Sequence, residues 1–297
     1  MFALQRICLL GAAALAFSLP AQADENLFGY VKGAETLPKG SKELYQFFTT
    51  RWDKGTGHYR ALDLTTELEY GYTDRFTVSA ELRAMSLNTS GLVIDGYLPG
   101  DKKLSLRSSG LELSGKYNFL SPAKDDIGLS GTAAFSHSWI DPHSGYKKKQ
   151  YSAEFGLQVQ KYFLEGQLIV AGNAALEATW AKRANIDDLP AGFDWPLEPE
   201  MEVEPTFGVG LSYRFAPGWF AGVEMLHQSE YETGVGKERW SLFAGPTLHY
   251  ASKDWWSTLT YVRQLKGGGE GYEGQPSGLH LIEKTRNELR LKLGYNF

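Results

Sequence analysis

The last residues of the chain alternate strictly between two kinds of side chain. From Glu288 to Phe297, every odd position is apolar or aromatic, and every even position is charged, polar or glycine. Successive side chains of a β-strand point to opposite faces, so this stretch predicts a strand with one apolar and one polar face. The apolar face has to be covered, either by a protein core or by lipid.

The same alternation recurs along most of the chain and predicts about twelve strands. We place these strands at residues 42–52, 59–72, 76–87, 104–119, 127–139, 150–163, 167–180, 201–215, 219–229, 239–250, 255–265 and 287–297. Short turns alternate with longer loops, of which the longest span residues 88–103, 181–200 and 266–282, and both chain ends fall on the short-turn side. The sequence therefore predicts an all-β fold over residues 42–297, an antiparallel up-and-down β-barrel that spans a membrane.

Two local irregularities are expected within these strands. The apolar phase slips near Ser108, Ser109 and Gly110, which predicts a β-bulge. Pro246 interrupts the strand at 239–250 on its apolar side and cannot donate a ladder hydrogen bond, so a bulge or a lost bond is expected there.

The N-terminus has the three parts of a secretory signal. Arg6 precedes an apolar run over residues 7–17, which is too short to span a bilayer, and residues 21–23 read Ala-Gln-Ala. We expect export with removal of residues 1–23, which would also remove Cys8, the single cysteine. The alternative for this stretch is a buried helix.

Aromatic residues gather at the predicted strand ends. One row lies on the short-turn side: Tyr70, Tyr72, Phe76, Tyr117, Phe119, Phe163, Phe215, Trp219, Tyr250, Trp255, Tyr295 and Phe297. A thinner row on the other side contains Trp139, Tyr151, Trp180 and Trp240. Amphipathic rings are typical of the two membrane interfaces of a barrel. The alternative is a soluble β-barrel with an aromatic core, in which the polar face would meet solvent.

The terminal strand, with Tyr295 and Phe297 at its end, resembles that of bacterial outer-membrane β-barrels. The resemblance implies that these two residues form the signal read by the barrel-assembly machinery. The run Gly33-Ala34-Glu35-Thr36-Leu37-Pro38-Lys39-Gly40 is similar to the start of an uncharacterised Gram-negative barrel family to which no activity is attached. Residues 24–41 are accordingly expected to form a periplasmic N-terminal segment, with both termini in the periplasm and the barrel in the outer membrane.

Charge and motifs exclude several functions. The chain has 30 basic and 35 acidic residues without a basic tract, which argues against nucleic acid as a partner. We find no nucleophile elbow, zinc spacing or phosphate-binding glycine loop, and the six histidines fall on separate predicted strands and loops. His137 and Ser138 are adjacent in a strand and so face opposite sides. We predict no enzyme, no cofactor and no metal.

The polar faces of the strands would line the lumen of the barrel. The ionisable residues expected there are Asp63, Glu67, Glu69, Glu81, Arg83, Glu112, Lys116, Glu154, Glu177, Arg214, Glu224, Arg239, Arg290 and Lys292. If the last strand pairs with the first, Arg290 and Lys292 should approach the acidic row of Asp63, Glu67 and Glu69. These charges either brace the wall as a neutralising network or form a charged pathway for solutes.

The inner row of the strand at 127–139 consists of small residues, which leaves space for water or for a loop folded inward. A barrel of about twelve strands lies between packed and open-pore sizes, so strand number does not decide conduction.

The leading hypothesis is a passive outer-membrane channel, porin-like, for small polar solutes, with membrane lipid around it. A second hypothesis is a non-conducting structural or adhesive barrel that acts through its long loops, and a third is a lipid-modifying enzyme.

Overall fold

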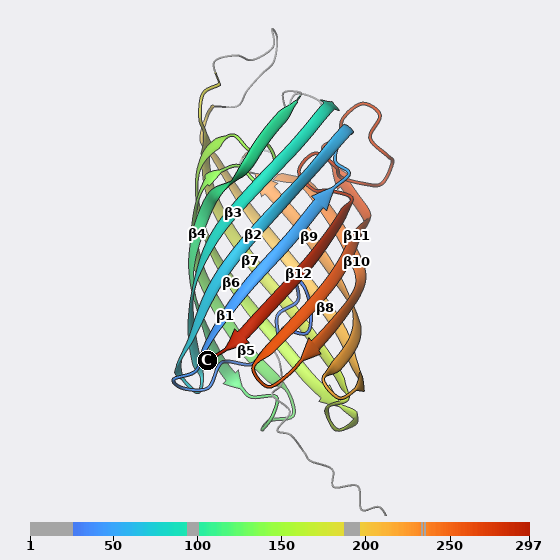
Figure 1. Cartoon of the computed structure of the whole chain (residues 1–297). Helices are drawn as coiled ribbons and strands as arrows, with labels where there is room; N and C mark the ends of the chain where they lie inside the picture. Colours follow the sequence, from blue (N-terminus) through green and yellow to red (C-terminus); the bar gives the residue numbers. More distant parts are fainter. Residues whose placement is uncertain (1–25, 94–100, 187–196, 233, 235) are drawn as a thin grey trace, which may run out of the picture.

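Twelve antiparallel strands close into one barrel (Figure 1). The computed structural model describes residues 26–93, 101–186, 197–232, 234 and 236–297. The strands are β1 (Lys42–Trp52), β2 (Thr56–Thr73), β3 (Phe76–Val93), β4 (Lys102–Leu120), β5 (Gly128–Ile140), β6 (Lys147–Phe163), β7 (Leu168–Arg183), β8 (Glu200–Ala216), β9 (Trp219–Glu232), β10 (Gly236–Ala251), β11 (Trp255–Gly269) and β12 (Asn287–Asn296), with a single-turn 3-10 helix η1 (Leu164–Gly166) before β7. The predicted fold class and strand number are confirmed.

The barrel closes by pairing of the first strand with the last. Glu43 lies opposite Asn296, and Trp52 lies opposite Asn287, in an unbroken antiparallel register. Every other strand pairs with its neighbours in sequence, as expected for an up-and-down barrel. The short turns lie at the end where β12 finishes, at the bottom of Figure 1, and we call this the short-turn end. The opposite end is the long-loop end.

The apolar face points outward and the polar face points inward. Leu113 and Phe155, in the middle of the wall, are 59% and 68% exposed, whereas Glu67 and Glu224 are 8% and 1% exposed. Leu68 and Leu211 are also exposed. A soluble barrel would bury these leucines and expose the carboxylates, so the soluble alternative is wrong.

Both aromatic rows form contacts along the outer wall. At the short-turn end, Trp219 packs against Tyr250 with ring centroids 4.7 Å apart, and Tyr250 lies 5.1 Å from Trp255. In the thinner row, Tyr151 stacks on Trp180 at 6.1 Å. The strands continue past this thinner row, because β3 reaches Val93 and β11 reaches Gly269, beyond the predicted ends at residues 87 and 265. These extensions carry no regular apolar face, so alternation could not reveal them.

Both predicted irregularities are present. The register of β3 and β4 shifts so that Arg83 faces Gly110 while Ala84 faces Ser108, which leaves Ser109 as the extra residue of a bulge. The pairing of β10 with β11 is interrupted between Ala244 and Thr247, the interval that holds Pro246.

The N-terminal segment, which we define as residues 26–41, enters the barrel from the short-turn end. Leu27, Phe28 and Val31 are buried against inward residues of β7, β9, β10 and β11, among them Leu226 and Phe243. The described part of the expected periplasmic segment packs inside the lumen, and the periplasmic side of residues 24–41 stays a prediction. The predicted signal, residues 1–23, lies outside the described residues.

The loop between β11 and β12 folds into the opposite end. Tyr272, Leu279, Leu281 and Ile282 are buried against inward residues of β2, β3, β4 and β5, such as Met85. We call this group the loop cluster. The lumen is thus packed by chain at both ends, and the polar wall between them encloses the candidate site.

Candidate functional site

A chamber of about 290 Å³ lies inside the barrel between the two packed ends. Its position follows from the order of inward residues along β3. Thr77 bonds the N-terminal segment, Glu81 and Arg83 line the chamber, and Met85 belongs to the loop cluster. Inward positions of a strand are two residues apart, so these contacts succeed one another along the barrel axis. The chamber is therefore a central compartment of the lumen.

The chamber wall carries charges of both signs. Arg83 binds Glu81 at 3.1 Å and also binds Glu112 on the neighbouring strand. Glu154 of β6 and Glu177 of β7 face Lys32 of the N-terminal segment across the same cavity. Glu177 also lines a second cavity of about 90 Å³, together with Glu202, Glu204, Lys148 and Lys284, so the two cavities adjoin at this side chain.

Glu224 of β9 holds the N-terminal segment by its backbone. One carboxylate oxygen accepts from the Gly29 N–H at 2.8 Å, and the other accepts from the N–H groups of Tyr30 and Val31 at 2.9 and 3.0 Å. Three consecutive N–H groups that converge on one anion form a nest. Glu224 is 1% exposed, so these bonds also satisfy a carboxylate that is buried in the lumen.

The two basic residues of β12 bind the same segment. The Arg290 guanidinium lies 3.8 Å from the centre of the Tyr30 ring and donates to the Gly29 carbonyl at 3.0 Å. Lys292 donates to the Asn26 side chain at 2.6 Å. The sequence predicted that Arg290 and Lys292 would approach the acidic row of β2. Lys292 lies near enough to Glu67 to attract its carboxylate, and both cations also bind the N-terminal segment.

The remaining predicted lumen residues are engaged in separate ways. Asp63 forms a two-bond pair with Arg51, at 2.5 and 3.0 Å. Lys116 donates to the Gly33 carbonyl at 2.8 Å, and Glu69 lies 3.0 Å from the Tyr45 hydroxyl. The structure leaves Glu67 buried beside the chamber, Arg214 half-buried near the short-turn end, and Arg239 in a buried ion cluster at the long-loop end. The role of these residues in a solute pathway stays a prediction.

The ion cluster fixes the β11–β12 loop. Arg239 binds Glu230 at 2.5 Å and Glu283 at 3.5 Å, and Lys284 reaches Glu204 at 3.5 Å. His280 is completely buried; its Nδ1 donates to the Glu270 carbonyl at 3.0 Å and its Nε2 accepts from the Glu283 N–H. Burial lowers the pKa of His280 to about 4, so the ring is neutral at pH 7.

Lys54, in the turn between β1 and β2, lies beneath the same loop. It donates to the Glu283 carbonyl at 3.2 Å and lies 5.1 Å from the centre of the Tyr59 ring. Burial lowers its pKa to about 7, against the attraction of the Glu283 carboxylate. The loop is therefore attached to the barrel by groups whose charge depends on pH.

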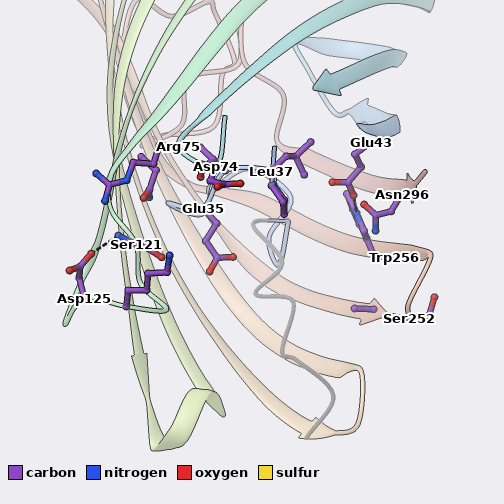
Figure 2. A pocket seen from close by; sticks show the side chains of 15 residues that line it. Glu35, Leu37, Glu43, Asp74, Arg75, Ser121, Asp125, Ser252, Trp256 and Asn296 are labelled. Carbon is purple, nitrogen blue, oxygen red and sulfur yellow. Dashed lines mark hydrogen bonds between the residues drawn. The ribbon is translucent and has the colours of Figure 1, made fainter. Parts of the chain in front are cut away.

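A cavity of about 490 Å³ opens at the short-turn end, where the N-terminal segment leaves the lumen. Figure 2 shows Glu35 and Leu37 of the segment between the β2–β3 turn, with Asp74 and Arg75, and the side chains of Glu43 and Trp256. Trp256 donates its indole N–H to Glu43. This mouth is the place where the segment could slide or leave without disturbing the barrel wall.

Sequence reasoning missed the N-terminal segment as part of the site. Leu27, Phe28 and Val31 lie among glycines in a stretch without periodicity, so no strand or helix is predicted there. The one available indication was that these three apolar side chains need a buried environment. It also missed Arg51, because the phase of β1 is blurred by the adjacent aromatics Phe47 and Phe48.

The described residues contain no cluster of three or more side chains suited to a metal. His137 stacks on the outward Tyr151 at 4.5 Å, while His143 lies half-buried at the long-loop end, 3.9 Å from Glu283. His137 and His143 therefore lie in different surroundings.

The sequence matches one family over residues 20–297. The chain belongs to the family of unknown function DUF6662. No curated protein matches it. This agrees with the resemblance of the sequence to an uncharacterised barrel family.

Solved structures share the fold at low sequence identity. The COG4313 outer membrane channel from Pseudomonas putida F1 superposes with a TM-score of 0.57 at 15% identity, over 89% of this chain and 98% of the channel. The β domain of the Bordetella autotransporter BrkA superposes with a TM-score of 0.55 at 12% identity, over 87% of this chain and all of that domain. The similarity shows a shared barrel fold, and the outward apolar band and the aromatic rows are those of a β-barrel that spans a membrane.

Proposed function

We propose that this barrel is a passive, porin-like channel for small polar solutes. The observation that carries the proposal is the chamber: a space of about 290 Å³, large enough for several water molecules, inside a twelve-stranded wall and lined by Glu81, Arg83, Glu112, Glu154 and Glu177. A barrel that served only as a scaffold would gain stability from an apolar filling, since charges in an enclosed space are costly unless water reaches them. Similarity of fold to a COG4313 channel supports the same role.

In this proposal the N-terminal segment is a removable plug. The segment is held by backbone hydrogen bonds to Glu224 and by contacts with Arg290 and Lys292. The barrel closes by pairing β1 with β12, so removal of the segment would leave no strand edge unpaired. Its departure through the 490 Å³ mouth would join the chamber to the short-turn end. We place that end in the periplasm, because outer-membrane barrels have short periplasmic turns and longer extracellular loops.

Planar-bilayer conductance tests the proposal. Protein that begins at Asp24 should show rare openings. Protein that begins at Thr36 and also lacks the loop 270–286, so that neither apolar cluster fills the lumen, should conduct steadily. Charge selectivity should change when Glu154 or Glu177 is replaced by Gln, because both border the chamber. Absence of current from the shortened protein, with the barrel shown to be folded by its heat-modifiable mobility, would refute the proposal.

A second role is supported by the packed ends. Two apolar clusters fill the lumen at opposite ends, which is also the arrangement expected of a non-conducting barrel that acts through its long loops. In that case neither protein would conduct, and deletion of the described loop 270–286 would abolish binding to the partner. Neither role requires an enzymatic activity, and we propose none.

A further inference from the structure

A basic groove is cut into the wall at the long-loop end, with a volume of about 600 Å³. It exists because β4 continues past the end of β5: their pairing starts at Gly110 and Ser138, so residues 102–109 of β4 have no partner on that side. The Trp139 indole bridges the gap by donating to the Ser108 carbonyl at 2.7 Å. Leu104, from the loop cluster, forms part of its floor.

Four exposed cations surround this groove: Arg107, Lys147, Lys149 and Lys182. Lys149 and Lys182 lie directly opposite each other on neighbouring strands. Like charges in that position repel, which costs stability unless an anion lies between them. Among the described residues, no carboxylate lines the groove.

Two further cations at the groove are already neutralised from inside. Lys148 faces Asp141 at 3.9 Å, and Arg183 binds Glu200. The buried cations thus have acidic partners, whereas the four exposed ones are turned toward the surroundings of the barrel. No carboxylate among the described residues lines the groove beside them, so these four side chains are open to a ligand from outside.

The short-turn end shows that this charge distribution is particular to the groove. Its turns carry both signs side by side, as in Asp74 with Arg75, Lys124 with Asp125, and Lys253 with Asp254. A general preference for cations at the membrane interfaces would have produced basic patches at both ends.

The groove also lies at the depth of lipid headgroups. Tyr151 and Trp180 of the thinner aromatic row lie two positions from Lys149 and Lys182 on the same outward face, on the side toward the short-turn end, and Lys149 lies 5.4 Å from the Tyr151 ring centre. Interfacial aromatic rings mark the headgroup level, so the cations project just beyond it. Phosphate groups attached to a membrane lipid occupy this level.

We infer that the basic groove binds a phosphorylated lipid of the surrounding leaflet. Its phosphates lie among Lys147, Lys149 and Lys182, with Arg107 at the β4 side, and one acyl chain extends along the exposed wall of the barrel. Charge-assisted bonds to phosphate supply the affinity, and the notch between β4 and β5 fixes the position of the headgroup. The inference depends on the membrane placement of the barrel and is independent of conduction through the lumen.

The test uses refolded protein in nanodiscs of neutral phosphatidylcholine, titrated with diphosphorylated lipid A, with bound lipid counted by native mass spectrometry. The variant K147Q/K149Q/K182Q removes three groove cations. The matched control K124Q/K161Q/K253Q removes three exposed lysines at the short-turn end. Each cation near a membrane surface contributes about fivefold to the affinity for an anionic lipid. The affinity for lipid A should therefore fall about 100-fold in the groove variant and less than threefold in the control.

Two further probes decide the source of the phosphate. Lipid A without its phosphates should bind both proteins weakly and equally, and inorganic phosphate should fail to displace lipid A at matched concentration. Unchanged lipid A binding in the folded groove variant, equal binding of dephosphorylated lipid A to the wild type, or displacement by inorganic phosphate would each overturn the inference.

Discussion

Replacement of Glu224 by Gln should release the N-terminal segment. The change keeps the size of the side chain but turns one carboxylate oxygen into an NH2 group. If the remaining oxygen still accepts from the Gly29 N–H, the NH2 group replaces the oxygen that accepts from the N–H groups of Tyr30 and Val31 at 2.9 and 3.0 Å, and these two hydrogen bonds are lost. Each hydrogen bond to a charged group contributes about 1.5–3 kcal/mol, so docking should weaken by about 3–6 kcal/mol.

A single cysteine reports the release. Val31 is 1% exposed, and Cys8, the single natural cysteine, precedes Asp24, so the V31C protein that begins at Asp24 carries one buried thiol. Its reaction with a water-soluble thiol reagent requires undocking. A loss of 3–6 kcal/mol raises the undocked fraction, and with it the labelling rate, by about 100- to 10,000-fold until most molecules are undocked.

The matched control for this experiment is E177Q. Glu177 borders the chamber and interacts with Thr179 on its own strand, without a hydrogen bond to the segment backbone. It should leave the labelling rate within threefold of wild type. If E224Q also changed labelling by less than threefold while the barrel kept its heat-modifiable mobility, the carboxylate would not hold the segment and the reasoning would be refuted.

Three further predictions concern the segment, the loop and the wall. Y30F removes a 2.6 Å bond to the Glu288 carboxylate, which at about 1.5–3 kcal/mol should speed V31C labelling by about 10- to 150-fold; an unchanged rate would mean that this bond does not hold the segment. His280 has a pKa of about 4 when folded and about 6.5 when exposed, so an open loop binds more protons between these values; loop docking should weaken by up to about 3 kcal/mol as pH falls from 6.5 to 4, measured by proteolysis of the loop. Burial also lowers the pKa of His143, so its protonation weakens loop docking in the same direction. H280Q should therefore remove part of the pH dependence and leave the part due to His143; an unaltered profile in H280Q would contradict the assignment. L113R should destabilise the folded barrel in bilayers by about 2–4 kcal/mol by reversible denaturation, whereas S136R, toward the chamber, should cost less; equal losses would argue against lipid at Leu113.

Much of the fold was predictable because a membrane barrel repeats one rule along its wall. The alternation at 287–297 and in eleven other stretches gave the strand number, the facing of residues such as Leu113 and Glu112, and the bulge at Ser109. Lipid on one side and polar contacts on the other impose a period of two wherever a strand crosses the bilayer. Beyond the aromatic rows that constraint ends, and the strand extensions were missed for this reason.

The candidate site was less predictable because it depends on segments without a period. The small inner face of β5 predicted space for water or for a loop folded inward. The N-terminal segment fills it instead, because Ser130 is completely buried and bonds the Ala34 carbonyl. Which segment would fill it could not be deduced, since loop and terminus were both long enough. The nest at Glu224 requires three consecutive backbone N–H groups, and a sequence pattern does not record backbone direction outside strands.

The contacts of the N-terminal segment have a consequence for the order of assembly. Gly29 and Asn26 bind partners 195 and 266 residues further along the chain, on β9 and β12. The earliest described part of the chain therefore cannot complete these contacts until β12 is in place, and contacts of such long sequence separation form late. Protection of the segment from chemical labelling therefore reports that β12 is in place. A barrel whose segment is labelled freely either lacks this last strand or has released the segment.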